Sequence, residues 1–147
     1  GQTTAGIRVG TGAGAAVLNT FGRQGLAKRW ERVGGLFAGR RRRLSDRQSI
    51  SGDVRGRGLA SGGDLVSDRG SREPAPVTTT AKIVYRGYQL GAAFTYVGLN
   101  ANVLEFMPPL TLTEPEVDEA ADIVDQAIGD VLDGKVADSD VAHFMMW

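Results

Sequence analysis

Apolar side chains recur at three- and four-residue steps in several segments, the spacing that places them on one face of a helix. The longest stripe comprises Leu26, Trp30, Val33, Phe37 and Leu44. We expect this helix to stop near residues 46–51. The stretch before it, residues 6–19, fits either a helix or a strand followed by a glycine loop, and Gly22 and Gly25 predict a break between the two segments.

Two further helices are predicted towards the C-terminus. A short amphipathic pattern around Ile83 ends at Gly91, a residue type typical of helix C-termini. The last helix has the clearest start signal, because Thr113 and Glu116 have the spacing of a capping box and Pro115 lies in the first turn. Its stripe of Val117, Ala120, Val124, Ile128 and Val131 predicts an end near Gly134. We expect residues 135–147 to form a frayed tail.

Short alternating segments predict the strands. Glycine-punctuated residues 52–66 suggest two strands or a bulged hairpin, and residues 67–76 read as a surface loop. Residues 93–98 and 102–107 alternate like strands, and a double proline stops the second. The predicted fold class is therefore α/β (α+β): a short, mainly antiparallel sheet with helices packed on one face.

Charge is divided unequally along a chain whose formal net charge is zero. Residues 1–86 hold 16 of the 17 Lys and Arg and 6 of the 17 acids, a net charge of +10, which leaves −10 on residues 87–147. Such a chain either folds back on itself or uses its basic half to meet an anion. The run Arg40–Arg43 lacks interleaved aromatic residues, so we expect a solvated helix end rather than a nucleic-acid site.

Several kinds of chemistry are excluded by composition. The 147 residues include no cysteine and a single histidine, His143, which excludes disulfides, thiolate nucleophiles and histidine metal clusters. No segment approaches the roughly 20 apolar residues that a membrane-spanning helix needs. We therefore expect a soluble, cytoplasmic protein that binds no metal, membrane or nucleic acid.

Three segments resemble one family, the class-III (ornithine/4-aminobutyrate type) pyridoxal-phosphate aminotransferases of fold type I. GDVRGRGL, residues 52–59, is similar to the glycine-rich strand that opens the small C-terminal domain of that family. NVLEFMPPLTLTEPEVDEA, residues 102–120, resembles its strand, double proline and capped last helix. GQTTAGIRVGTGAGAAVL, residues 1–18, aligns with the family's glycine-threonine motif and the alanine-rich helix that follows it.

The resemblance implies the C-terminal part of such an enzyme, with a helical lead-in over about residues 1–48 and a sheet-and-helix domain over about 49–134. The family uses pyridoxal 5'-phosphate to transfer an amino group from an amine or amino acid to a 2-oxo acid. None of Lys28, Lys82 and Lys135 matches the family's Schiff-base lysine, and we expect all three to be solvated. The chain is therefore expected to be inactive alone, and to work as a homodimer or with a complementary large-domain chain.

Two site residues follow from the resemblance. Thr3 aligns with the threonine that reaches the cofactor phosphate of the neighbouring subunit, although it also suits a helix N-cap. Glu105 stands where many members have an arginine that clamps the substrate carboxylate. A glutamate there would repel a carboxylate and prefer an amine or hydroxyl end, unless it pairs with Arg55 or Arg57 across the sheet. We expect both of these arginines to be structural, with ion pairs or carbonyl contacts that fix the sheet to the helices.

Two other functions remain open at this stage. The chain could be a non-catalytic interaction module that keeps the small-domain fold and offers an apolar face to a partner. Gly10, Gly12 and Ala15 also resemble part of a dinucleotide-binding loop, which would require a preceding strand and parallel strand pairing.

Overall fold

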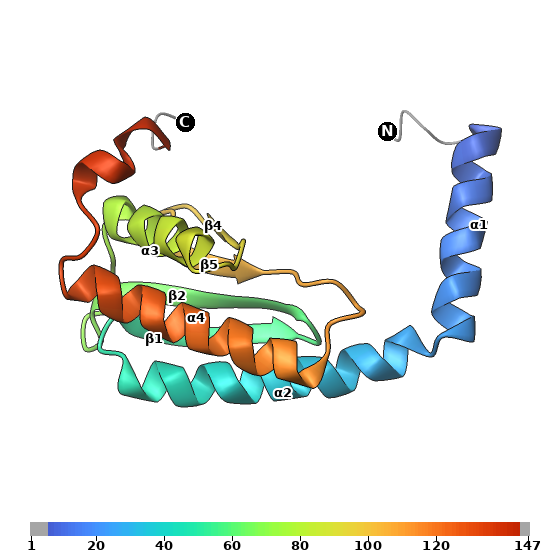
Figure 1. The fold of residues 1–147 in the computed structure, drawn as a ribbon, viewed down its shortest axis with the longest axis horizontal. Coiled ribbons are helices and arrows are strands. Elements are labelled where there is room, and N and C mark those ends of the chain that lie inside the picture. The colour runs from blue at the N-terminus through green and yellow to red at the C-terminus, as the bar shows by residue number, and fades with distance from the viewer. Residues whose placement is uncertain (1–5, 145–147) are drawn as a thin grey trace.

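The computed structural model describes residues 6–144, which form an α/β fold with a small antiparallel sheet (Figure 1). The main helices are α1 (Arg8–Arg23), α2 (Leu26–Arg47), α3 (Val77–Gln89) and α4 (Glu114–Leu132). The strands are β1 (Ser51–Arg57), β2 (Ala60–Asp68), β3 (Glu73–Pro74), β4 (Thr95–Val97) and β5 (Val103–Phe106). Two short 3-10 helices follow, η1 (Asp138–Asp140) and η2 (Ala142–Phe144).

The sheet has the strand order β1-β2-β5-β4, and β3 pairs with the far end of β2. Every pairing is antiparallel, as the alternating segments predicted. The register places Arg55 opposite Gly62, and Gly62 in turn opposite Glu105. On the other side of β5, Glu105 lies opposite Thr95. These four residues therefore form one row across the sheet.

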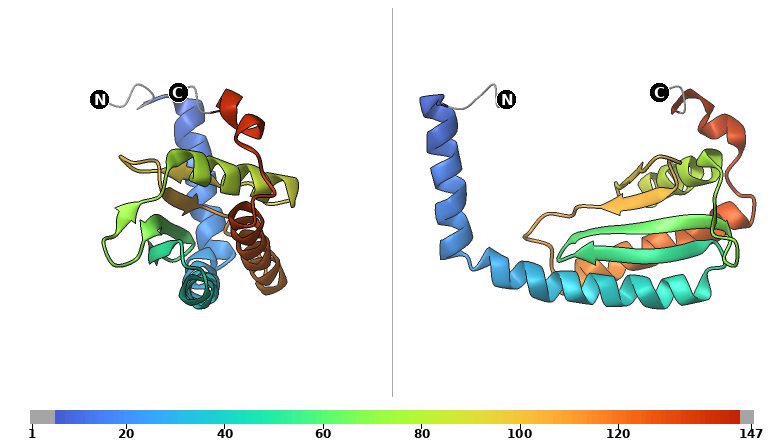
Figure 2. Two further views of the ribbon diagram at one scale, coloured as in Figure 1. Left: turned by 90° about the vertical axis from the view of Figure 1, so that its left-hand side faces the viewer. Right: turned by 180° about the vertical axis from the view of Figure 1, so that it is seen from behind.

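Helices α2, α3 and α4 cover one face of the sheet, and the opposite face carries no helix (Figures 1 and 2). Alternate strand residues such as Leu65, Leu104 and Phe106 point into the helical layer and are at most 6% exposed. They meet Phe37 of α2 and Val124 of α4 in the core. The predicted stripes therefore form the core, and the alternate strand positions form an open face.

Helix α1 projects from the rest of the molecule and meets α2 at a corner (Figure 1), and Gly25 is the N-cap residue of α2. Gly25 has a φ of 58°, a left-handed conformation that glycine adopts without strain. The predicted break is confirmed, and residues 8–23 are helical rather than extended. No residue of α1 is buried, and Val9 and Leu18 are 82% and 74% exposed.

The start of α4 is confirmed in detail. The carboxylate of Glu116 accepts a hydrogen bond from the backbone N–H of Thr113 at 2.7 Å, which completes the predicted capping box. This hydrogen bond, together with that from the Thr113 hydroxyl, lowers the pKa of Glu116. Stabilising these first-turn groups fixes where the chain turns from the double proline into α4.

The unequal charge distribution is largely explained by the chain folding back on itself. Within residues 6–144, four ion pairs join the basic first part to the acidic second part: Arg32–Glu114, Arg40–Asp118, Lys82–Asp138 and Arg86–Asp130. Three of them hold α2 or α3 against α4. The exposed pairs contribute little individually, but their placement is consistent with one arrangement of the helices.

Asp130 is the most buried acid in these ion pairs, with its side chain 8% exposed. Its two carboxylate oxygens accept hydrogen bonds from Lys135 at 2.7 Å and Arg86 at 2.8 Å. These two bonds lower the pKa of Asp130. The ionised carboxylate, on α4, therefore links α3 to the segment after α4 through these two hydrogen bonds.

We expect this cluster to make stability fall in acid. Because the pKa of Asp130 is lower in the folded state, its contribution is present above the unfolded pKa, near 3.8, and is lost as pH falls through the folded value. Asp130→Asn should flatten the decline in unfolding free energy between about pH 5 and pH 3. Asp122→Asn, at an exposed position on the same helix, is the control. Denaturant unfolding across this pH range would contradict the account if both variants followed the parent curve.

The segment after α4 corrects the prediction of a frayed tail, at least as far as Phe144. Val136 is 4% exposed and Val141 is fully buried. Lys82 forms an ion pair with Asp138, and the rings of Tyr85 and Phe144 lie 5.9 Å apart. The segment therefore packs on α3, because its apolar residues find partners there that no local periodicity revealed. Lys82, expected to be solvated, has a side chain that is only 19% exposed.

Arg41 corrects the prediction that the whole arginine run is a solvated helix end. It is 7% exposed, and its guanidinium lies over the Phe106 ring, 4.1 Å from the ring centroid. Burial lowers its pKa to about 10. Arg41 follows Val33 and Phe37 at four-residue steps, so the helix directs it into the core. Its neighbours Arg42 and Arg43 are exposed, as expected.

Candidate functional site

The face of the sheet without helices carries the side chains with the most distinctive chemistry. Its central row runs from Arg55 through Gly62 and Glu105 to Thr95. Gly62 has no side chain, so nothing rises above the sheet between Arg55 and Glu105. Adjacent strands lie about 4.8 Å apart, which separates the backbones of these two charged residues by roughly 10 Å. They are therefore not direct cross-strand neighbours.

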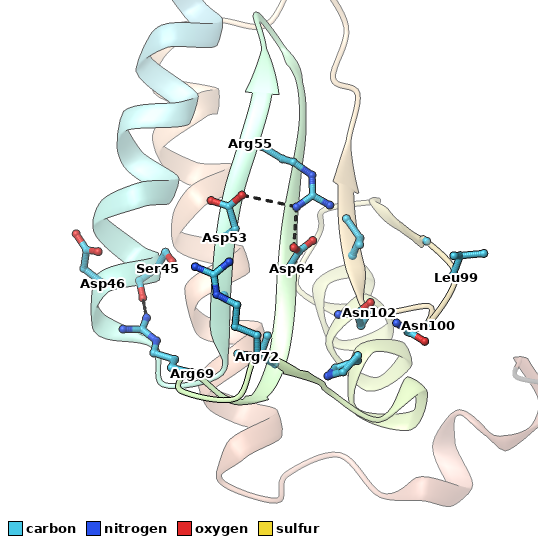
Figure 3. A pocket seen from close by; sticks show the side chains of 15 residues that line it. Ser45, Asp46, Asp53, Arg55, Asp64, Arg69, Arg72, Leu99, Asn100 and Asn102 are labelled. Atoms are coloured by element: carbon cyan, nitrogen blue, oxygen red, sulfur yellow. Dashed lines mark hydrogen bonds and ion pairs between the residues drawn. The ribbon is translucent and has the colours of Figure 1, made fainter.

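Arg55 does not pair with Glu105, which corrects one of the alternatives that the sequence left open. Its Nη1 donates to Asp64 at 2.6 Å and lies 3.7 Å from Asp53 (Figure 3). The hydrogen bond and the charge of Asp64 raise the pKa of the Arg55 guanidinium. Arg55 therefore forms ion pairs, but within the sheet rather than between the sheet and the helices as predicted, whereas Arg57 has no ion pair among residues 6–144.

Glu105 lies in an open hollow of about 340 Å³ at the β4 side of the face. The hollow is lined by Ala93, Phe94, Thr95, Glu105 and Met107. Glu105 is half-buried, and within the described part of the chain its carboxylate has neither an ion pair nor a hydrogen bond. The carboxylate is therefore available to a ligand.

A larger hollow of about 580 Å³ lies over β1 and β2 on the same face (Figure 3). Asp53, Arg55 and Asp64 line it, and Arg69 and Arg72 rise from the β2–β3 loop. Arg69 is committed to structure, because it donates to backbone oxygens at the end of α2, including that of Gln48 at 2.8 Å. Three acids and three arginines line this hollow, so it favours no single ligand charge.

The described lysines do not fit the requirement of pyridoxal phosphate for a covalent amine. Lys82 pairs with Asp138, and Lys135 pairs with Asp130 and Asp133. Lys28 is exposed on α2. None of the three lines either hollow of the open face. The described lysines therefore offer no amine beside either hollow that could hold the cofactor.

The structure tests one of the two phosphate-binding motifs that the sequence suggested. Thr3 lies outside the described residues, so its proposed contact with phosphate stays a prediction. Gly10, Gly12 and Ala15 lie within helix α1, and the sheet pairings are antiparallel. The dinucleotide-binding interpretation, which needs a loop between a strand and a helix, is therefore wrong.

Sequence reasoning missed several features of the face. Phe94 and Met107 were counted as strand residues but line the hollow beside Glu105. Gly87, inside helix α3, makes room for the ring of Phe94, since a Cβ there would lie 2.3 Å from that ring. The signal was the glycine itself, because an interior helical glycine often marks a close approach.

This antiparallel sheet, with helices on one face, also occurs in solved transaminases. A solved transaminase from work on directed evolution by ancestral reconstruction superposes with a TM-score of 0.84 and 27% identity, over 91% of this chain and 30% of that chain. The sequence matches the family model of the class-III aminotransferases over residues 1–128. The chain belongs to this family.

Curated relatives carry more than one activity. A leucine/methionine racemase of Thermococcus litoralis is 36% identical over 99% of this chain and 32% of its own length. A 4-aminobutyrate aminotransferase of Mycobacterium leprae is 32% identical over 88% of this chain and 29% of its own length. The chain thus spans about a third of these relatives. Within residues 6–144, no helix is long and apolar enough to cross a membrane.

Proposed function

We propose that the chain is the C-terminal small-domain region of a pyridoxal-phosphate-dependent class-III aminotransferase. The observation that carries this proposal is the antiparallel sheet with helices on one face, which superposes on a solved transaminase with a TM-score of 0.84 and has an open face whose hollows no lysine lines. On this proposal residues 1–48 are the helical lead-in and residues 49–134 the sheet-and-helix domain. Residues 135–147 are a C-terminal extension, of which the described part packs on α3.

The proposed reaction moves an amino group from an amine or amino acid to a 2-oxo acid. When bound, the cofactor supplies the electron sink for this chemistry. This chain positions the substrate end through Glu105, and Thr3 contacts the cofactor phosphate of a neighbouring subunit. The Schiff-base lysine comes from a large domain, which is either part of a longer polypeptide or a complementary chain. The assembly is a cytoplasmic homodimer or such a complex.

Pyridoxal phosphate should therefore fail to label this chain specifically. After incubation with the cofactor and reduction with borohydride, peptide mass mapping should find only substoichiometric labelling. The label should follow exposure, with Lys28 ahead of the part-buried, ion-paired Lys82. Lys28→Arg should remove the part of the label on that residue and leave weak labelling of Lys135, whose side chain is 58% exposed. Stoichiometric labelling of one lysine, retained at low cofactor concentration, would contradict the proposal.

A non-catalytic interaction module is the second candidate, and helix α1 favours it. Every residue of α1 is at least partly exposed, including the apolar Val9 and Leu18. An uncovered helix with apolar residues is typical of a surface that meets another polypeptide. The two candidates differ in what that polypeptide carries: a lysine-bound cofactor for the aminotransferase, and none for the module.

A further inference from the structure

We infer that the hollow around Glu105 binds a primary alkylammonium group. The burial and the missing partners of the Glu105 carboxylate support this inference. Glu105 is half-buried on β5, faces Gly62 on one side and Thr95 on the other, and has no partner of its own among residues 6–144. A carboxylate that is partly withdrawn from water gains most from a cationic hydrogen-bond donor.

The charges on the surrounding face also favour a cationic ligand. Arg55 lies two strands away and is already neutralised by Asp64 and Asp53. Arg57 lies opposite Ala60, at the end of β1, and forms no ion pair with Glu105. The charge of Glu105 therefore stays uncompensated on its own strand. An anionic ligand would meet repulsion there, whereas a cation would be attracted.

The side chains that line the hollow suit an alkylammonium group. Phe94 borders the hollow, but its ring lies on the helical side of the sheet with Phe106 rather than on the side of the Glu105 carboxylate. The ring is held in place by stacking on Phe106, with centroids 5.1 Å apart. Met107, 71% exposed, adds an adaptable apolar surface, and the Thr95 hydroxyl adds an acceptor. An ammonium has three donors, and its alkyl chain suits the remaining walls.

The identity of the ligand as a substrate rests on the proposed function. If Glu105 faces the substrate of an aminotransferase, the distal end of that substrate is an amine. The donor class is then a diamine, rather than an amino acid held by its carboxylate. The subsite itself depends only on the geometry of residues 93–107.

The test is an NMR titration of the full 147-residue chain with butylammonium chloride. A five-heavy-atom ligand is expected to bind with a Kd on the order of millimolar. The amides of Thr95, Glu105 and Met107 should shift, and sodium butyrate should leave them unchanged. Glu105→Gln should weaken butylammonium binding about tenfold or more, since a charged partner is removed at constant shape. Glu119→Gln, on the exposed side of α4, is the matched control and should bind like the parent.

The outcomes separate the inference from the proposed function. Equal binding by Glu105→Gln and the parent, or equal shifts with butyrate, would overturn the ammonium subsite. Specific lysine labelling by pyridoxal phosphate would overturn the proposed function while leaving a positive titration intact. In the longer, lysine-bearing enzyme, Glu105→Gln should lower kcat/KM for 1,4-diaminobutane relative to 4-aminobutyrate. An unchanged ratio would overturn the assignment of the subsite to substrate.

Discussion

Gly34→Ala is expected to lower the free energy of unfolding by about 3 kcal/mol, a large part of the stability of a typical domain. Gly34 lies on α2 where the helix meets the β1–β2 turn. A Cβ there would lie 2.2 Å from the backbone carbon of Gly58, which cannot move aside like a side chain. Trp30 packs against the same turn residue. The helix would have to separate from the sheet.

Gly35→Ala is the matched control for this prediction. Gly35 is the next residue of the same helix, and a Cβ there would meet no atom within 4 Å. Alanine is a better helix former than glycine by about 1 kcal/mol, so this variant should be as stable as the parent or more stable. Urea unfolding followed by circular dichroism measures both. Similar midpoints for the two variants would show that α2 does not pack on this turn as described.

Gly63→Ala is expected to cost about 2 kcal/mol, because of Arg41 rather than because of the strand. A Cβ at Gly63 would lie 2.1 Å from Nη2 of Arg41, whose guanidinium is held between this glycine and the ring of Phe106. The arginine would have to leave its cation–π contact. Its Nη1 already has no hydrogen-bond partner within the described chain, so this buried charge is poorly compensated.

A double-mutant cycle isolates the coupling between the two residues. Arg41→Leu replaces a buried, unpaired cation with an apolar side chain and is expected to be nearly neutral. In that background Gly63→Ala should lose most of its cost, giving a coupling of more than about 1 kcal/mol in unfolding experiments. Additive effects would mean that Gly63 is required for a reason other than the space taken by Arg41.

The elements with regular periodicity could be predicted from the sequence. The α2 stripe from Leu26 to Phe37 and the capping box at Thr113 depend on neighbours along the chain, so their spacing is visible in the letters. The two strand segments at residues 93–98 and 102–107, and a mainly antiparallel sheet, were predicted from short alternating patterns. Local physical chemistry was sufficient for these features.

The features that the sequence did not reveal depend on distant partners. Val141 is buried only because α3 lies beneath it, more than fifty residues earlier in the chain. Arg41 reaches Phe106 and Gly63, which join it only through the sheet register. The β3 strand, Glu73–Pro74, forms inside a segment predicted as a loop because β2 offers it an edge.

The candidate site, too, was only partly predictable from the sequence. The resemblance identified Glu105, but only the register shows that Gly62 separates it from Arg55. The freedom of its carboxylate therefore follows from the fold. Thr3 remains a prediction from the resemblance, since it lies outside the described residues.

The central claim is that this chain is one wall of a pyridoxal-phosphate site whose lysine lies elsewhere. The most direct measurement is an absorbance spectrum, with intact masses, of the protein purified natively from its source. The account predicts a visible band from bound cofactor and a lysine-bearing polypeptide that either contains this sequence or co-elutes with it. A colourless 147-residue chain that purifies alone and stays colourless with added pyridoxal phosphate would contradict the account.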